Sequence, residues 1–137
     1  RASIAAWRGV SDAANLREPL ALDVRDRPSW PDRQWSTIVC INMVHISPWA
    51  ATEALMEMAG RTLAPAGLLA LYGPYREADA PLADSNAAFD ESLKARDPAW
   101  GLRDRDDVIA QAKAHGLAFT LRKALPANNL MLLFRRA

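Results

Sequence analysis

Ser36-Thr37-Ile38-Val39-Cys40-Ile41-Asn42 is the stretch of sequence that decides the fold class. It is apolar nearly throughout and rich in β-branched residues, which predicts a β-strand. An apolar run of this kind is typical of a strand that is buried on both faces, in a parallel sheet with helices on either side. Residues 68–72, Leu-Leu-Ala-Leu-Tyr, form a second run of the same type.

The segment between these two strands is expected to be a helix. Ser47 followed by Pro48 is a favourable helix start, because a hydroxyl N-cap precedes proline at the first helical position. Apolar residues then recur at helical spacing as far as Leu63, and Pro65 and Gly67 end the pattern. A strand, a helix and a strand in succession favour a parallel pair with a right-handed crossover, and therefore an α/β fold.

Further elements are expected on the N-terminal side of this unit. Residues 2–15 predict a helix, and residues 20–24 predict a short buried strand, which the proline-rich loop of residues 25–34 follows. The chain opens with Arg1 inside a helical pattern, so we expect it to be a piece of a longer protein.

The C-terminal side predicts two helices and a hairpin. Ser85 can cap a helix that Pro98 ends, and Asp104 can cap another that Gly116 ends. Two strand-like runs then flank a turn that contains proline and asparagine, which predicts an antiparallel pair over residues 117–125 and 130–134.

Composition narrows the class of protein. With 137 residues, half of them hydrophobic, we expect a single domain over residues 1–137. Lys and Arg total 17 and Asp and Glu total 16, and they alternate in residues 103–107 as on a solvated surface, so no nucleic-acid partner is expected. The lone Cys40 fits a reducing compartment, and no metal-ligand spacing stands out. Without a membrane-spanning run or a signal peptide, a cytoplasmic location without membrane contact is expected.

Several stretches of the sequence are similar to stretches of known proteins. The segment from Leu63 to Leu69 is similar to the turn into the fifth strand of small-molecule methyltransferases, and the segment from Asn42 to Trp49 is similar to the one after their fourth strand. Five stretches stand out together: residues 42–49, 72–75, 85–90, 95–101 and 126–130. In combination they resemble one uncharacterised family, DUF938, which includes methyltransferase-like protein 26. The resemblance implies a Rossmann-like class I methyltransferase sheet with a C-terminal antiparallel hairpin, and S-adenosylmethionine as the cofactor.

One departure from the family pattern affects the cofactor. Such proteins carry a glycine-rich turn after the first strand and an acidic residue after the second, whereas this chain has six glycines and no Gly-x-Gly. By the family pattern the chain starts after the second strand, so its sheet is expected to be truncated at the N-terminus. We therefore expect the chain alone to bind S-adenosylmethionine weakly or not at all, and the glycine-rich turn to lie upstream.

The resemblance also implies roles for individual residues. Asp23, with Val24, would lie at the end of the third strand near the adenine, and Asn42 and Met43 would contact the cofactor from the end of the fourth strand. His45 is the candidate base, although a structural role for it is equally open. Core packing is the alternative for Trp49. The candidates for substrate contact are Trp49, Tyr72, Tyr75, Ser85, Asn86 and Asn128.

Three functions remain open. The first is methyl transfer to a small-molecule substrate, and the second is a non-catalytic interaction module with a methyltransferase-like fold. The third is a nucleotide-binding oxidoreductase, which the final antiparallel hairpin disfavours. A sheet that lacks its first strands would expose an apolar edge, which favours a homodimer through that edge, a rearrangement of the sheet or domain swapping.

Overall fold

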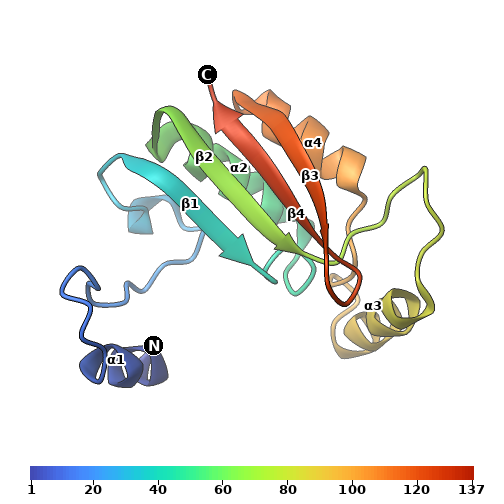
Figure 1. The fold of residues 1–137 in the computed structure, drawn as a ribbon, viewed down its shortest axis with the longest axis horizontal. Coiled ribbons are helices and arrows are strands. Elements are labelled where there is room, and N and C mark those ends of the chain that lie inside the picture. The colour runs from blue at the N-terminus through green and yellow to red at the C-terminus, as the bar shows by residue number, and fades with distance from the viewer.

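Four strands form one mixed sheet in the computed structural model, which describes residues 1–137 (Figure 1). The strands are β1 (Trp35–Ile41), β2 (Leu63–Gly73), β3 (Leu117–Leu125) and β4 (Asn129–Arg136), in the spatial order β1-β2-β4-β3. β1 and β2 are parallel, with Ile38 opposite Leu69. β4 is antiparallel to both of its neighbours. The predicted parallel pair, the predicted hairpin and the α/β class are confirmed.

The helix between the parallel strands, α2 (Trp49–Thr62), starts differently from the prediction. Pro48 occupies the N-cap position, and the Ser47 hydroxyl donates a hydrogen bond to the Met43 carbonyl at 2.8 Å instead of capping the helix. β2 follows α2 without a loop. The register between β1 and β2 shifts from Trp35–Leu63 to Thr37–Leu68, so the strand bulges and accommodates residues 64–67, including the proline and glycine expected to precede it.

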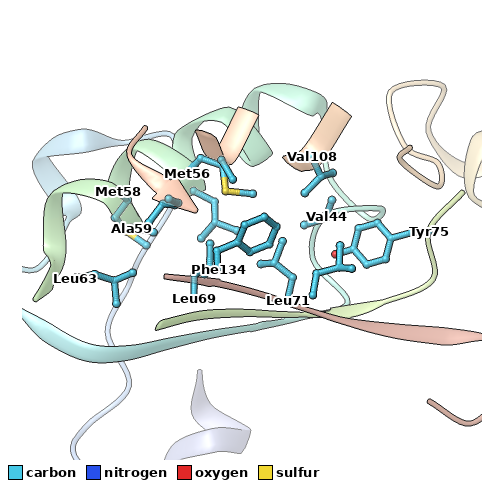
Figure 2. Close-up of a cluster of buried hydrophobic side chains, with 14 of the residues drawn as sticks. Val44, Met56, Met58, Ala59, Leu63, Leu69, Leu71, Tyr75, Val108 and Phe134 are labelled. Atoms are coloured by element: carbon cyan, nitrogen blue, oxygen red, sulfur yellow. The ribbon is translucent and has the colours of Figure 1, made fainter. Parts of the chain in front are cut away.

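One face of the sheet carries the hydrophobic core. α2 and α4 (Arg105–Ala114) lie together behind the sheet in Figure 1. Their apolar side chains meet alternate residues of β2 and β4, as Figure 2 shows for Met56, Leu69, Leu71, Val108 and Phe134. The C-terminal ends of α2 and α4 are so close together that a Cβ atom added at Gly60 would overlap the carbonyl oxygen of His115. This face therefore fixes both helices and the carboxyl ends of β1 and β2.

The opposite face of the sheet is open, and the expectation of a strand buried on both faces is wrong for β1. Val39 and Ile41 are 59% and 62% exposed, because no helix covers this side of the sheet. The predicted helix over residues 2–15 is shorter, α1 (Ala2–Gly9), and it buries no residue. Figure 1 shows α1 away from the sheet.

Residues 20–24 do not form the predicted strand. β1 pairs with β2 alone, so residues 20–24 form no backbone hydrogen bonds with its outer edge. A strand without such a partner would leave its backbone groups unpaired. The only regular element between α1 and β1 is a short 3₁₀ helix, η1 (Arg27–Ser29). No helix in the structure has both the length and the apolar character needed to cross a bilayer.

The remaining elements frame the far end of the sheet. α3 (Asp84–Arg96) has Ala83 at its N-cap, so the predicted Ser85 cap is wrong by two residues. Asp104 caps α4 as predicted, accepting a hydrogen bond from the Asp106 amide at 2.9 Å, and Gly116 follows with φ of 75°. In the hairpin turn, Ala127 and Asn128 both have positive φ, 58° and 56°, which is the backbone of a type I′ turn.

Candidate active site

Two adjoining hollows lie where β1 and β2 end. The first has a volume of about 370 Å³ and the second about 520 Å³, and Ile46 lines both. We call the first the amide hollow; its lining is Asn42, His45, Ile46, Pro74, Ser85, Asn86, Phe89, Ala127 and Asn129. We call the second the aspartate hollow; its lining is Leu22, Asp23, Val24, Arg25, Met43, Ile46, Ser47, Pro48, Ala51, Asp97 and Trp100. Carboxyl ends of parallel strands are where open α/β sheets bind ligands.

The amide hollow unites sequence stretches that are far apart in the chain. Residues 42–46 follow β1, Pro74 follows β2, residues 85–89 begin α3, and residues 127–129 form the hairpin turn. Two hydrogen bonds join the last two stretches: Asn86 Nδ2 donates to the Asn128 carbonyl, and Asn128 Nδ2 donates to Ser85 Oγ, both at 3.1 Å. Four of the five family-like stretches thus converge on one site, which no single stretch could form.

His45 is the titratable group of the amide hollow. The residue is 2% exposed, and its ring meets the Phe89 ring edge-on at 5.6 Å between centroids. Burial, together with the nearby Arg103 guanidinium, lowers the pKa of His45, so the ring is neutral at neutral pH. His45 is one of the residues that line the hollow. A neutral imidazole in this position can accept a proton.

Arg103 holds the turn that carries His45. Its guanidinium donates to the Ser47 carbonyl at 2.7 Å and to the Ala99 carbonyl at 2.8 Å. The next loop contributes as well, because the Gly101 amide donates to the His45 carbonyl at 3.0 Å. The interpretation of residues 103–107 as solvated surface is therefore wrong for Arg103, whose partner Ser47 lies far away in sequence and gave no local signal.

Gly73 is a second site residue that the sequence did not reveal. A Cβ atom at this position would lie 2.9 Å from His45 Cε1 and 3.3 Å from Asn42 Oδ1, so the glycine makes room for both side chains. Asn42 itself has φ of 55°, and its backbone amide donates to the Tyr72 carbonyl at 2.9 Å. The left-handed conformation turns the chain out of β1 and is one that asparagine adopts readily. The glycine in residues 72–75 was the available signal.

The aspartate hollow contains three of the predicted cofactor residues, Asp23, Val24 and Met43. Hydrogen bonds from the Arg25 side chain and amide lower the pKa of Asp23, and the Asp23 side chain is 51% exposed. The Val24 carbonyl accepts a hydrogen bond from Trp30 Nε1 at 2.8 Å, which fixes this loop against η1. Asn42, the fourth predicted cofactor residue, lines the amide hollow instead, next to Met43.

Adenosine chemistry is a reasonable match for the aspartate hollow. A half-exposed carboxylate can accept a hydrogen bond from an exocyclic amine, and a thioether beside it can pack on a purine face. The volume lies within the range of small-molecule sites. These residues suit the adenosine portion of S-adenosylmethionine.

Four of the six predicted substrate residues lie outside both hollows: Trp49, Tyr72, Tyr75 and Asn128. Trp49 begins α2 and is half-buried, with the Arg103 guanidinium 5.9 Å from the ring centroid, so it packs against that arginine. Tyr72 alternates along β2 with the buried Leu71, which directs its side chain toward the open face of the sheet.

The other two border a third hollow, of about 250 Å³, beneath residues 77–83. Tyr75 is 5% exposed and packs beside Val44 and Leu71 in the core (Figure 2), where burial raises its pKa. Asn128 uses its amide on Ser85. Asn86 lines both this hollow and the amide hollow, so the two are neighbours.

Solved structures with a similar fold are methyltransferases. Mitomycin 7-O-methyltransferase is 16% identical with a TM-score of 0.78, and the match covers 99% of this chain and 38% of that one. An O-methyltransferase family protein from Burkholderia thailandensis is 13% identical with a TM-score of 0.73, covering 85% and 34%. Human N-acetylserotonin methyltransferase, solved with S-adenosylmethionine, is 15% identical with a TM-score of 0.64, covering 74% and 29%.

These matches establish a class I methyltransferase fold, and the chain spans about a third of the length of the structures it matches. The family described as "Protein of unknown function (DUF938)" matches residues 1–136. The chain therefore belongs to the DUF938 family.

Proposed function

We propose that this chain forms the acceptor side and the adenosine side of a methyltransferase site, which transfers a methyl group from S-adenosylmethionine to an oxygen of a small molecule. The observation that carries the proposal is the junction of two hollows at Ile46, one with an adenosine-compatible lining and the other with a neutral histidine. The O-methyltransferase names of the similar structures support oxygen as the acceptor atom.

Asp23, Val24 and Met43 would hold the adenosine end of the cofactor. The surface pair of Asp23 with Arg25 is half-exposed and contributes little to stability, so the carboxylate can exchange that partner for an amine. When bound, S-adenosylmethionine supplies an electrophilic methyl group on a sulfonium centre. The part of this chain is to hold the acceptor in line with it, and alignment alone can supply most of the acceleration.

His45 would receive the proton of the acceptor hydroxyl as the oxygen becomes methylated. Its neutral ring, which lines the amide hollow, is in the form needed to do so. General base catalysis typically contributes about 10²–10⁴-fold to a rate. Replacing His45 by glutamine should therefore lower kcat by at least about a hundredfold if proton removal limits the reaction. An unchanged kcat would leave alignment as the sole contribution of the site.

The decisive experiment uses the product of the complete open reading frame that encodes this chain. Titration calorimetry with S-adenosylhomocysteine should give one site, and Asp23→Ala or Met43→Ala should weaken binding by about tenfold, the loss expected for one hydrogen bond or packing contact. Asp12→Ala, on the exposed N-terminal segment, is the matched control and should bind like the wild type. Absence of binding by the wild-type protein would refute the proposal.

A non-catalytic interaction module is the second candidate, and one observation favours it. The outer edge of β1 is unpaired, and the exposed Val39 and Ile41 continue the apolar surface of the open sheet face. An uncharged edge strand of this kind is a template for pairing with another chain. A homodimer through β1, without cofactor binding, would support this alternative.

A further inference from the structure

We propose that the molecule bound in the amide hollow is a neutral ring compound that carries hydroxyl groups. This inference rests on the proposed function, because it names the acceptor class of that same site.

The walls of the amide hollow suit a flat ring. His45 and Phe89 stand at 70° to each other with centroids 5.6 Å apart, and Ile46, Pro74 and Ala127 complete the apolar part of the lining. Aromatic rings pack well in such edge-on and offset arrangements. A volume of about 370 Å³ lies at the lower end of the range for small-molecule pockets, which suits one or two rings.

Two amide oxygens among the polar groups that line the hollow are free to accept a hydrogen bond. Asn86 Nδ2 donates to the Asn128 carbonyl at 3.1 Å, and Asn129 Nδ2 donates to the Pro126 carbonyl at 3.2 Å. A backbone carbonyl can only accept, so these contacts assign the amide nitrogens, and the Oδ1 atoms of both asparagines are left for a ligand. Asn86 is 8% exposed, and its Oδ1 opens onto the space that Asn86 lines, which comprises the amide hollow and the neighbouring third hollow. Acceptors of this kind select a ligand with O–H or N–H donors.

No arginine lines the amide hollow, and the arginines near it are held by other groups of the chain. Arg76 pairs with the buried Asp90, and Arg103 donates to backbone carbonyls. Arg122 pairs with Glu77, which has a lowered pKa, mainly because of the hydrogen bonds from Arg122. With a neutral His45 beside them, the Oδ1 atoms would repel a carboxylate or phosphate group. A neutral hydroxyl, in contrast, can donate to these oxygens or to the imidazole.

The test compares three probes of one shape on the 137-residue chain. Catechol is neutral with two hydroxyl donors, benzoate carries an anion on the same ring, and 1,2-dimethoxybenzene has no donor. In ¹H–¹⁵N correlation spectra, we expect catechol to shift the side-chain amides of Asn42, Asn86 and Asn129 and to bind at least tenfold more tightly than the other two. Binding of benzoate or dimethoxybenzene at equal strength, or no shift of these amides at millimolar catechol, would overturn the inference.

A variant keeps the comparison specific to the hollow. Asn42→Gly retains a residue that tolerates a φ of 55° and removes the amide, so catechol affinity should fall several-fold. Asn15→Gly, at an exposed site outside the hollow, should leave it unchanged. Cofactor binding is measured separately. If the complete gene product binds S-adenosylhomocysteine but the catechol series fails, the acceptor class is rejected and the methyl-transfer proposal is retained. Catechol selectivity without cofactor binding rejects methyl transfer alone.

Discussion

Replacing Asp90 by alanine should destabilise the fold by about 3 kcal/mol, because its carboxylate joins three parts of the chain. Asp90 lies on α3 and is 3% exposed. It accepts hydrogen bonds from the Leu102 amide at 2.8 Å, from Lys94 Nζ at 2.7 Å, and from Arg76 after the end of β2. The carboxylate therefore fixes α3, which carries Ser85 and Asn86 into the amide hollow.

The magnitude follows from how deeply each partner is buried. A hydrogen bond to a charged group contributes about 1.5–3 kcal/mol to stability. The bond from the Leu102 amide is buried, so we assign it this full range. The Lys94 and Arg76 side chains are 53% and 41% exposed, so solvent screening reduces each of their contributions to about 0.5 kcal/mol. The sum is about 2.5–4 kcal/mol, a large fraction of the stability of a small domain.

The same carboxylate predicts a dependence of stability on pH. Burial acts to raise the pKa of Asp90, but the hydrogen bonds from Lys94, the Leu102 amide and Arg76 outweigh it, so the pKa lies below its ordinary value. A folded-state pKa below the unfolded value means that the stabilisation is complete above about pH 4 and is lost as the pH falls further. The difference between wild type and Asp90→Ala should therefore shrink below pH 4.

Urea denaturation followed by circular dichroism, at pH 7 and at intervals down to pH 3, measures both effects. Glu91→Ala is the matched control, since Glu91 is the next residue of the same helix and is exposed. Surface substitutions of this kind usually change stability by less than about 0.5 kcal/mol. If Asp90→Ala were no more destabilising than Glu91→Ala at pH 7, the role assigned to the buried carboxylate would be wrong.

Three further predictions concern the site and the sheet edge. Gly73→Ala should lower the free energy of unfolding by about 1–3 kcal/mol and shift the His45 ring resonances, because the added Cβ atom meets that ring. Gly9→Ala, with nothing within 4 Å of the added atom, should do neither, and equal spectra for both variants would contradict this prediction. Burial raises the pKa of Cys40 to about 11, so its alkylation by iodoacetamide at pH 8 should be roughly 200-fold slower than that of a free thiol. An equal rate would show that the thiol is not buried. If β1 pairs between chains, sedimentation equilibrium should show a dimer that Val39→Lys converts to monomer; a wild-type chain that is monomeric at every concentration would exclude that edge.

Much of the sheet could be predicted because its signals are local. Residues 36–42 and 68–72 are apolar runs around a helical periodicity, and residues 126–129 carry turn residues between two strand-like runs. The Asp104 cap and the Gly116 stop depend only on their immediate neighbours. In contrast, residues 20–24 have a strand-like composition but no neighbouring strand, and composition cannot reveal a missing ladder partner.

The site could be predicted in part, for a related reason. Asn42, His45 and Asn86 were found because they follow a strand or begin a helix at the edge where ligands bind. Tyr72 was placed with them by sequence position, whereas alternation along the strand directs it to the open face. Gly73 and Arg103 were missed because their roles depend on contacts with His45 and Ser47, which the folded chain alone brings near.

The spatial order β1-β2-β4-β3 also limits how the chain can reach its folded state. β3 and β4 are joined by a tight turn and can pair early in folding, because closing so short a loop costs little entropy. β2 can pair with β4 only after a far larger loop has closed, because α3, α4 and β3 lie between them in the chain. We therefore expect the docking of β2 on a preformed hairpin to limit the folding rate, and the amide hollow, which needs the ends of both, to form after that step.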